Sequence, residues 1–379
     1  MARSAFPAFP ALPTPHRPYH IAVIGAGMAG TACARTLVQA GFRVTVFEKE
    51  AQAGGRMAHV DTRNGTFDAG VQFFTVRDPR FAQALDVVAP GVCKPWSATT
   101  IVVLDEHGQK VSKPTSSEQH WVATPGMGDL VRLWAAPLAA EGLLHTGTQV
   151  EAMERDALDP HLWQLRVTGP QSTSRVHAGF NAVVLALPAP EAQRLLTGSA
   201  VQSPLLLPLS DVQMQPCWTL MLAYPQAMQP GLTTLGPNWN VATSTHHRIA
   251  WLARESSKPG RSWIERWTVH ASAEWSSKHA GDTPARVMAK LHKAFTEVTG
   301  IHVQPGYMDV RLWPHARTTT PLGQSFAWDT HEQFGVCGDW CVGMRVEDAF
   351  LSGLDLALAI AAQVERTVSA PTPEAAAVA

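Results

Sequence analysis

The glycine-rich segment 21–30, Ile-Ala-Val-Ile-Gly-Ala-Gly-Met-Ala-Gly, constrains the fold more than any other part of the sequence. Its apolar start predicts a buried strand, and a helix of small residues follows over 31–40. In this G-x-G-x-x-G spacing, Gly25 permits the tight turn, Gly27 lets backbone N–H groups approach a pyrophosphate, and Gly30 lets the helix pack close to the strand. The segment therefore predicts dinucleotide binding. The alternative is a glycine turn that only connects packed elements.

Further motifs indicate which dinucleotide is bound. A second strand over 43–47 ends in Glu48, whose carboxylate is placed to accept hydrogen bonds from a ribose. Gly54-Gly55-Arg56-Met57 follows, and the guanidinium of Arg56 suits pyrophosphate oxygens. Near the other end of the chain, a short apolar strand closes on Gly338-Asp339, and a helix is predicted over 347–364.

An NAD dehydrogenase shares the ribose-binding acid, but it needs neither the second glycine turn nor the C-terminal strand and helix. In an FAD enzyme, Asp339 would hydrogen-bond the ribityl–pyrophosphate side, and the helix N-terminus would face the flavin N1–C2=O edge. We therefore expect FAD. The alternatives are a surface loop for the second glycine pair and a plain terminal helix.

The pattern between these motifs predicts an α/β fold: a glutathione-reductase-like Rossmann FAD-binding domain with an inserted antiparallel-sheet substrate domain. Alternating or apolar runs over 218–224, 248–254 and 267–273 indicate the inserted sheet, and a helix over 284–299 packs on it. The expected boundaries are a disordered leader 1–18, a discontinuous FAD domain 19–75, 120–200 and 306–366, a substrate domain 76–119 and 201–305, and a disordered tail 367–379.

Composition narrows the class of protein. The net charge is −1 and no run of Lys or Arg exceeds two residues, so we expect no nucleic-acid partner. No apolar stretch approaches the ~20 residues of a membrane span, and the leader lacks the apolar core of a signal peptide. Five widely spaced cysteines predict a reducing, cytoplasmic compartment. Cys337 and Cys341 lack further ligands at metal spacing, so we expect no metal.

With these motifs, the chain resembles the bacterial members of the renalase branch of the flavin amine-oxidase superfamily. The narrower matches are the Trp251-Leu-Ala-Arg…Ser-Lys-Pro-Gly-Arg261 stretch, the Trp267-Thr-Val-His-Ala-Ser272 segment and Cys337-Gly-Asp-Trp-Cys341. The resemblance implies an amine-oxidase-like fold, as also seen in p-hydroxybenzoate hydroxylase, and non-covalent FAD. It further implies oxidation of dihydronicotinamide dinucleotides reduced at ring position 2 or 6, with O₂ reduced to H₂O₂.

The candidate site residues follow from the motifs and the resemblance. The proposed catalytic residues are His270, Gln72, Arg317 and Arg345. The proposed cofactor contacts are Gly25, Gly27, Met28, Ala29, Gly30, Glu48, Lys49, Gly55, Arg56, Met57, Gly70, Val71, Gln72, Phe73, Val150, Gly338, Asp339, Arg345, Val346, Glu347 and Ala349. Lys258 and Arg261 suit a substrate phosphate, but beside Pro259-Gly260 a solvated turn is the favoured interpretation.

Two competing functions stay open. One is oxidation of a small amine. Arg345 stands where amine oxidases of the superfamily place a substrate-cage aromatic, which disfavours a cationic amine. The other is a non-catalytic FAD-binding module, against which the second domain argues. No Cys lies between Arg317 and Phe334, so the FAD is expected to be non-covalent.

Overall fold

The apolar run ahead of the first glycine turn lies at the centre of a six-stranded sheet in the computed structural model, which describes residues 19–96, 101–112, 118–228 and 236–369. Five strands are parallel, in the order β20-β13-β1-β2-β9, and β19 pairs antiparallel at the edge. The strands are β1 His20–Ile24, β2 Arg43–Phe47, β9 Leu144–His145, β13 Ala182–Leu185, β19 Phe326–Asp329 and β20 Phe334–Cys337.

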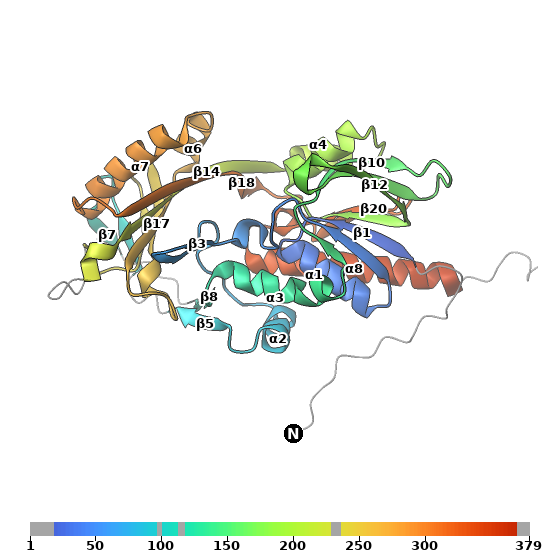
Figure 1. Ribbon diagram of the computed structural model, residues 1–379, viewed down its shortest axis with the longest axis horizontal. Helices are drawn as coiled ribbons and strands as arrows, with labels where there is room; N and C mark the ends of the chain where they lie inside the picture. The colour runs from blue at the N-terminus through green and yellow to red at the C-terminus, as the bar shows by residue number, and fades with distance from the viewer. Residues whose placement is uncertain (1–18, 97–100, 113–117, 229–235, 370–379) are drawn as a thin grey trace, which may run out of the picture.

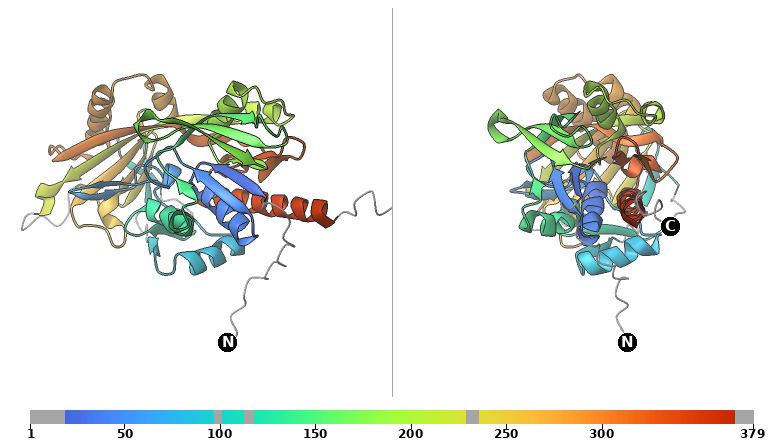
Figure 2. Two further views of the ribbon diagram at one scale, coloured as in Figure 1. Left: turned by 45° about the vertical axis from the view of Figure 1, so that its right-hand side comes forward. Right: turned by 90° about the vertical axis from the view of Figure 1, so that its right-hand side faces the viewer.

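The two faces of this sheet are covered by different layers. Figure 2 shows the layers on either side of the sheet. Ile21 and Val23 of β1 pack against helices, whereas Ala22 and Ile24 pack under a three-stranded sheet and α4. The helices are α1 Met28–Gln39, α3 Met127–Ala140 and α8 Val346–Ser369 on one side, with α4 Ala189–Gly198 and strands β10 Gln149–Arg155, β11 Trp163–Thr168 and β12 Ser174–Phe180 on the other. A parallel sheet covered on both faces explains why its strands are almost continuously apolar.

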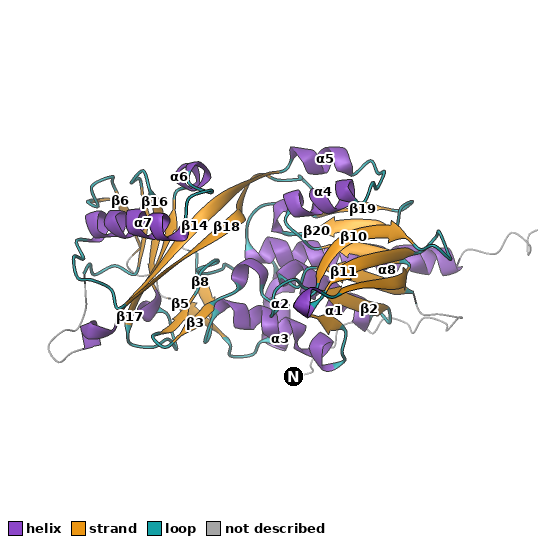
Figure 3. Cartoon of the chain, turned by 45° about the horizontal axis from the view of Figure 1, so that its top comes forward, coloured by secondary structure: helices purple, strands orange, loops and turns teal. Residues whose placement is uncertain are grey.

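A seven-stranded sheet forms the second lobe, and its long strands β14 and β18 reach back to the first (Figure 1). Helix α7, Pro284–Thr299, lies along one face of this sheet (Figure 3). Its apolar side chains Val287, Leu291 and Phe295 belong to the same core cluster as the strands below. The sheet runs in the order β18 Tyr307–Thr320, β14 Gln213–Tyr224, β17 Glu265–Ala271, β16 Ile249–Arg254, β15 Val241–Ser244, β6 Ile101–Leu104 and β7 Lys110–Ser112.

Shorter elements complete the described part of the fold. They are the hairpin β3 Val60–Thr62 and β4 Gly65–Phe67, the pair β5 Cys93–Trp96 and β8 His120–Ala123, and helices α2 Pro79–Val88, α5 Leu206–Asp211 and α6 Ala273–Lys278. No helix in the described ranges is long and apolar enough to cross a bilayer.

The predicted α/β class with an inserted antiparallel sheet is confirmed, but the structure divides the chain differently at two places. Residues 307–320 form β18 of the seven-stranded sheet, because they pair with β14 along most of its length. Within 76–119, β6 and β7 join that sheet, whereas α2 packs on the helical layer, with Phe81 5.1 Å from Phe350 between ring centroids.

The helix ends also differ slightly from the sequence prediction. Helix α1 begins at Met28 and α3 at Met127, each within the first residues after its glycine turn. Helix α8 continues to Ser369, three residues into the predicted tail. The leader 1–18 and residues 370–379 lie outside the described residues.

Candidate active site

The turn between β1 and α1 leaves a narrow gap beside the start of the helix. Gly25 has φ 103°, and an added Cβ would lie 2.5 Å from the carbonyl oxygen of Ala186. A Cβ added to Gly27 would face only Gly55 of the second glycine turn, whose Cα would be 3.9 Å away. The buried first turn of α1 consists of Met28, Ala29 and Gly30. Glycines keep this gap open, so the helix N-terminus is accessible to phosphate oxygens.

Glu48 lies at the end of β2, and both oxygens of its buried carboxylate accept backbone hydrogen bonds. Ala26 N donates to Oε2 at 2.7 Å and Glu50 N donates to Oε1 at 2.9 Å. Burial raises the pKa of this carboxyl, and the two donors partly oppose that effect. Each oxygen has a further lone pair, so Glu48 can hold the turn and still accept ribose hydroxyls. Its neighbour Lys49 points to the surface, where Nζ lies 2.8 Å from Glu191 Oε2.

Arg56 and Asp339 come from opposite ends of the sequence and form a bidentate ion pair. Arg56 Nη1 donates to Asp339 Oδ2 at 3.0 Å, and Nη2 donates to Oδ1. Gly338 N donates to Ser352 Oγ at 2.8 Å, which ties the end of β20 to α8. The buried Met57 follows Arg56 in the core below. The two motifs assigned to the pyrophosphate side of a flavin dinucleotide are therefore adjacent in space.

The start of α8 differs from the sequence prediction. Glu347 is predicted as a cofactor contact, but its buried Oε1 accepts hydrogen bonds from Arg77 N and Asp78 N, both at 2.7 Å. It therefore anchors the segment before α2. The side chain of Arg345 is exposed, within electrostatic range of Glu118. The other predicted contacts occupy packed positions: Val346 and Ala349 in the helical layer, and Val150 in β10, against the core under the three-stranded sheet.

The loop after β4 connects the cofactor motifs to the seven-stranded sheet. A Cβ on Gly70 would lie 2.0 Å from Arg56 O, and Val71 N donates to the same oxygen at 3.0 Å. The Gln72 amide is used within the protein, because Nε2 donates to Asp68 O and Oε1 accepts from Lys258. We predict from sequence that Gln72 orients the flavin edge, but this amide instead fixes the loop.

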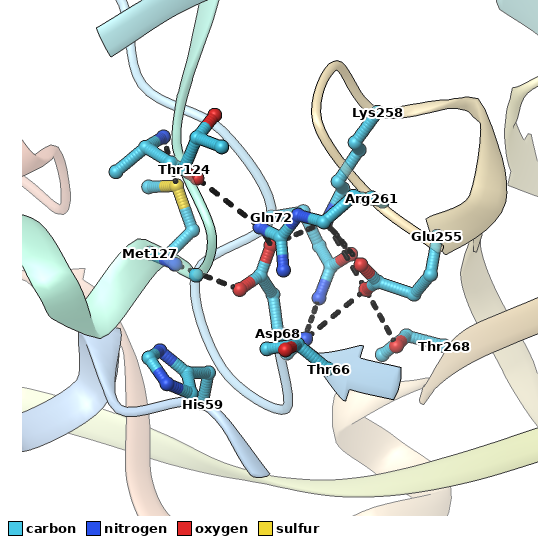
Figure 4. Close-up of polar contacts among 12 residues, drawn as sticks. His59, Thr66, Asp68, Gln72, Thr124, Met127, Glu255, Lys258, Arg261 and Thr268 are labelled. Atoms are coloured by element: carbon cyan, nitrogen blue, oxygen red, sulfur yellow. Dashed lines mark hydrogen bonds and ion pairs between the residues drawn. The ribbon is translucent and has the colours of Figure 1, made fainter. Parts of the chain in front are cut away.

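Beneath this loop lies a fully buried ion cluster, defined here as Asp68, Glu255, Lys258 and Arg261 (Figure 4). Lys258 Nζ lies 2.8 Å from Asp68 Oδ2, 3.1 Å from Glu255 Oε1 and 3.1 Å from Gln72 Oε1. Arg261 Nη2 donates to Asp68 Oδ2 at 2.6 Å. The interpretation of Lys258 and Arg261 as a solvated turn is therefore wrong, because their side chains are 0% and 1% exposed.

The ion cluster joins the loop after β4 to α3 and to the loop after β16. Met127 N, at the start of α3, donates to Asp68 Oδ1 at 2.9 Å, and Thr268 Oγ1 donates to Glu255 Oε1 at 2.8 Å. Burial alone would raise the pKa of Asp68, but Lys258 and Arg261 hold it below its ordinary value. The ion cluster thus brings two carboxylates into contact with two basic side chains.

A row of polar side chains crosses the seven-stranded sheet on the face opposite α7. We define the polar row as Trp251, His270, Thr219 and Arg311, which are directly paired across β16, β17, β14 and β18. Directly paired residues point to the same side of a sheet. The alternate residues, such as Leu220 and Val269, pack under α7. The polar row therefore faces the loop after β4.

Contacts between lobes agree with this orientation. The Phe73 ring centroid lies 3.9 Å from that of His120 and 5.7 Å from that of Trp251. Trp313 Nε1 donates to Ala69 O at 3.0 Å. Burial, and then the Lys258 charge, lower the pKa of His270 to about 4, so its ring is neutral at pH 7. The predicted residues Gln72, Phe73 and His270 are thus brought together.

Arg317 is placed differently from this group. Its side chain is exposed on β18 opposite Gln215, beyond an irregularity in the strand pairing. Sequence reasoning missed Thr219, Trp251 and Arg311 as site residues. The available signal was the alternation of side chains along a strand. Each of these residues is polar or amphipathic and stands between apolar residues that face the other side of the sheet.

Two family models match the chain. A model of an NAD(P)-binding Rossmann-like domain matches residues 23–87, and a model of flavin containing amine oxidoreductases matches residues 107–361. The cyclohexylamine oxidase of Brevibacterium oxydans is a similar solved structure, with a TM-score of 0.64 and 15% identity over 92% of this chain and 100% of that one. At this identity the likeness concerns the fold.

Curated relatives match over shorter segments. A 4,4'-diapophytoene desaturase of Staphylococcus haemolyticus is 47% identical over 58 residues, 15% of this chain and 12% of its own length. Protoporphyrinogen oxidase 2 of Arabidopsis thaliana is 24% identical over 144 residues, 38% of this chain and 24% of its own length. The chain thus spans a quarter or less of the length of these relatives.

The residues described above fit the FAD that the family model implies. The glycine gap suits the pyrophosphate, and Glu48 suits a ribose. The Arg56–Asp339 ion pair joins the second glycine turn to the end of β20. FAD is therefore the cofactor of this fold. Its non-covalent attachment stays a prediction.

Proposed function

The chain belongs to the flavin containing amine oxidoreductases, and on that premise we propose that it is an oxidase of dihydronicotinamide dinucleotides whose transferable hydride is at ring position 2 or 6. Bound FAD would supply the electron acceptor, taking a hydride from the substrate and passing both electrons to O₂, which leaves as H₂O₂. The balanced reaction is NAD(P)H + H⁺ + O₂ → NAD(P)⁺ + H₂O₂.

One observation carries this proposal: the polar row presents a cation and neutral groups toward the loop after β4. Arg311 stacks on Trp313, with 4.1 Å from its Cζ to the ring centroid, and forms no ion pair within the described ranges. His270 is neutral, and Trp251 and Thr219 carry no charge. Such a surface suits a substrate with a neutral ring and an anionic arm. A small amine brings a positive charge and finds no carboxylate in the polar row.

The reaction requires positioning more than acid–base catalysis. A dihydropyridine loses its C–H bond as hydride and becomes an aromatic pyridinium, so no side chain has to remove a proton from the substrate. His270, neutral and partly buried, can donate or accept a hydrogen bond without exchanging a proton. The protein has to hold the donor carbon about 3–3.5 Å from the acceptor atom. A pocket that does so for position 2 or 6 holds position 4 too far away.

Oxidation of a small amine is the alternative activity, and the family match is compatible with it. Steady-state H₂O₂ formation distinguishes the two. FAD-loaded protein is supplied in air with 1,2- or 1,6-dihydro-NAD(P), with ordinary 1,4-NADH, or with a panel containing benzylamine and a polyamine. We expect peroxide in stoichiometric amounts from the 1,2 or 1,6 isomer and little from the others. Faster turnover of any amine would replace the proposal by the alternative.

A further inference from the structure

A cavity of about 350 Å³ opens on the second lobe, away from the candidate active site. Its wall is formed by the turn before β16, by α6 and by Lys290 of α7. Helices α6 and α7 lie on the same side of the seven-stranded sheet (Figure 1). The polar row occupies the opposite face, so the sheet separates this cavity from the candidate active site. Its volume lies within the range of about 300–1,000 Å³ that is typical of ligand-binding clefts.

Basic side chains dominate the wall of this cavity. Arg248, Lys278 and Lys290 line it, and Glu274 supplies the one carboxylate among the described lining residues. Glu274 Oε1 accepts a hydrogen bond from Lys278 Nζ at 2.7 Å, and both side chains are largely exposed, which places this pair at the mouth. Lys278 and Glu274 balance each other. Arg248 and Lys290 therefore determine the charge of the inner wall.

Arg248 is fixed in position, yet most of its guanidinium is unused. Its backbone N donates to His246 Nδ1 at 3.2 Å, and its carbonyl oxygen accepts from Ser272 N at 2.9 Å. The guanidinium forms no ion pair with a described carboxylate and donates from Nη1 to Lys290 O at 3.4 Å. A guanidinium has five N–H donors, so the others are available to a ligand in the cavity.

The carboxylate nearest to Lys290 is shared among several basic groups. Asp282 Oδ2 lies 2.8 Å from His279 Nδ1, and it lies 3.4 Å from both Lys290 Nζ and Arg286 Nε. One carboxylate thus serves an imidazole, an ammonium and a guanidinium. It can neutralise one positive charge, so the group as a whole keeps an excess of positive charge beside the cavity.

An anion with several acceptor oxygens fits this wall. Arg presents a planar fork of donors and Lys a compact positive charge, and both side chains are used in proteins to bind phosphate. A phosphate group offers three acceptor oxygens and up to two negative charges, whereas a carboxylate offers two oxygens and one charge. The His279 ring lies 4.3 Å from the Trp275 ring between centroids. This part of the wall is therefore held in place by packing.

We propose that the cavity is a binding site for the phosphate group of a small molecule, with Arg248 and Lys290 as its ligands. The site is separate from the positions assigned to FAD. It would exist whichever substrate the flavin oxidises, so its test does not depend on the proposed function.

Isothermal titration calorimetry of the FAD-loaded protein with inorganic phosphate, AMP and adenosine tests the site at constant ionic strength. Bound FAD fills the glycine gap, so the phosphates cannot bind there. The variants are Arg248→Met, Arg248→Lys and Lys290→Met. Lys293→Met is the matched control, because Lys293 is a largely exposed cation on the same helix and pairs with Glu297 at 3.9 Å. Arg311→Met reports any binding at the candidate active site.

In the wild type we expect saturable binding of phosphate and of AMP, and none of adenosine. Arg248→Met should weaken AMP binding about 10–100-fold and Lys290→Met about tenfold, because each removes a charged hydrogen bond. Arg248→Lys should weaken it less, because it keeps the charge and loses the fork. Lys293→Met and Arg311→Met should bind AMP within about twofold of the wild type. Far-UV circular dichroism and FAD content confirm that each variant is folded.

Three results would overturn the proposal. The first is a wild-type protein that binds neither phosphate nor AMP. The second is equal weakening by Lys293→Met and Lys290→Met, which would show general attraction to a basic surface. The third is affinity that persists in Arg248→Met and Lys290→Met but is lost in Arg311→Met, which would place the anion at the candidate active site. Tighter binding of AMP than of free phosphate would identify a phosphate ester as the ligand, and the reverse order would identify the free anion.

Discussion

Replacing Lys258 by Met tests the ion cluster, since Met has a similar length and no charge. In the native protein two basic side chains contact two carboxylates, and all four side chains are buried. Lys258→Met leaves Asp68 paired with Arg261 at 2.6 Å, while Glu255 keeps the Thr268 hydroxyl and the electrostatic influence of the buried Arg266. Glu255 then loses its direct ion-pair partner. Removing one partner of a buried ion pair costs about 3–5 kcal/mol.

The free energy of unfolding is measured by urea titration of the FAD-loaded protein, followed by tryptophan fluorescence. We expect Lys258→Met to lower it by about 3–5 kcal/mol, a large share of the about 5–15 kcal/mol typical of folded proteins. The double variant Glu255→Gln/Lys258→Met removes one charge of each sign. It should recover about 1–3 kcal/mol relative to Lys258→Met.

The matched control is Lys278→Met. Lys278 pairs with Glu274 at 2.7 Å, but both side chains are exposed, so Lys278→Met should unfold at the same urea concentration as the wild type. A Lys258→Met protein as stable as the wild type would show that the ion cluster does not hold the loops together. A double variant no more stable than the single one would show that the unpaired carboxylate of Glu255 is not the cause.

Three further predictions concern the cofactor fold and its titration. Glu48→Ala should weaken FAD binding about 10–100-fold in a fluorescence titration, because a charged hydrogen bond is lost, and unchanged affinity would remove Glu48 from the ribose site. Gly353→Ala should lower the melting temperature, because its Cβ would lie 2.1 Å from Ala29 O. Gly198→Ala is the control: its Cβ would have no neighbouring atom within 4 Å, so it should melt at the wild-type temperature. The pKa of His270 is lowered from 6.5 to about 4, so the unfolded chain binds its proton first and stability should fall as pH drops from 6.5 to 4. His270→Gln should fall less steeply over that range in urea titrations at each pH, and an equal slope would contradict the shift.

The parts of the fold with local signals were predictable from sequence. Helix α7 begins at Pro284 and ends before Gly300, which has φ 71°, and both are helix-end signals that do not depend on distant residues. The glycine turn and Glu48 were also predictable from local sequence, because the spacing of the glycines and of the acid determines the turn between β1 and α1. Strand β18 lacked such a signal, since its assignment depends on pairing with β14, far earlier in the chain.

The site was less predictable because it, too, depends on contacts between residues that are far apart in the sequence. A charged residue beside Pro-Gly is ordinarily solvated. Lys258 is buried because it pairs with Asp68. Asp68 lies 190 residues earlier in the sequence, so the local sequence does not reveal this partner. The sequence predicts that Gln72 lies near the flavin, but the hydrogen bond that its amide oxygen accepts follows only from the position of Lys258. The polar row exists only through the register of four strands.

The central claim is that the flavin accepts hydride from position 2 or 6 of a dihydronicotinamide. Stopped-flow mixing of the anaerobic, FAD-loaded protein with each dihydro-NAD(P) isomer, with 1,4-NADH and with benzylamine measures this step directly through loss of the oxidised-flavin absorbance. The account predicts rapid bleaching by the 1,2 or 1,6 isomer, slow bleaching by 1,4-NADH and none by the amine. Faster bleaching by benzylamine than by every dihydro isomer would contradict it.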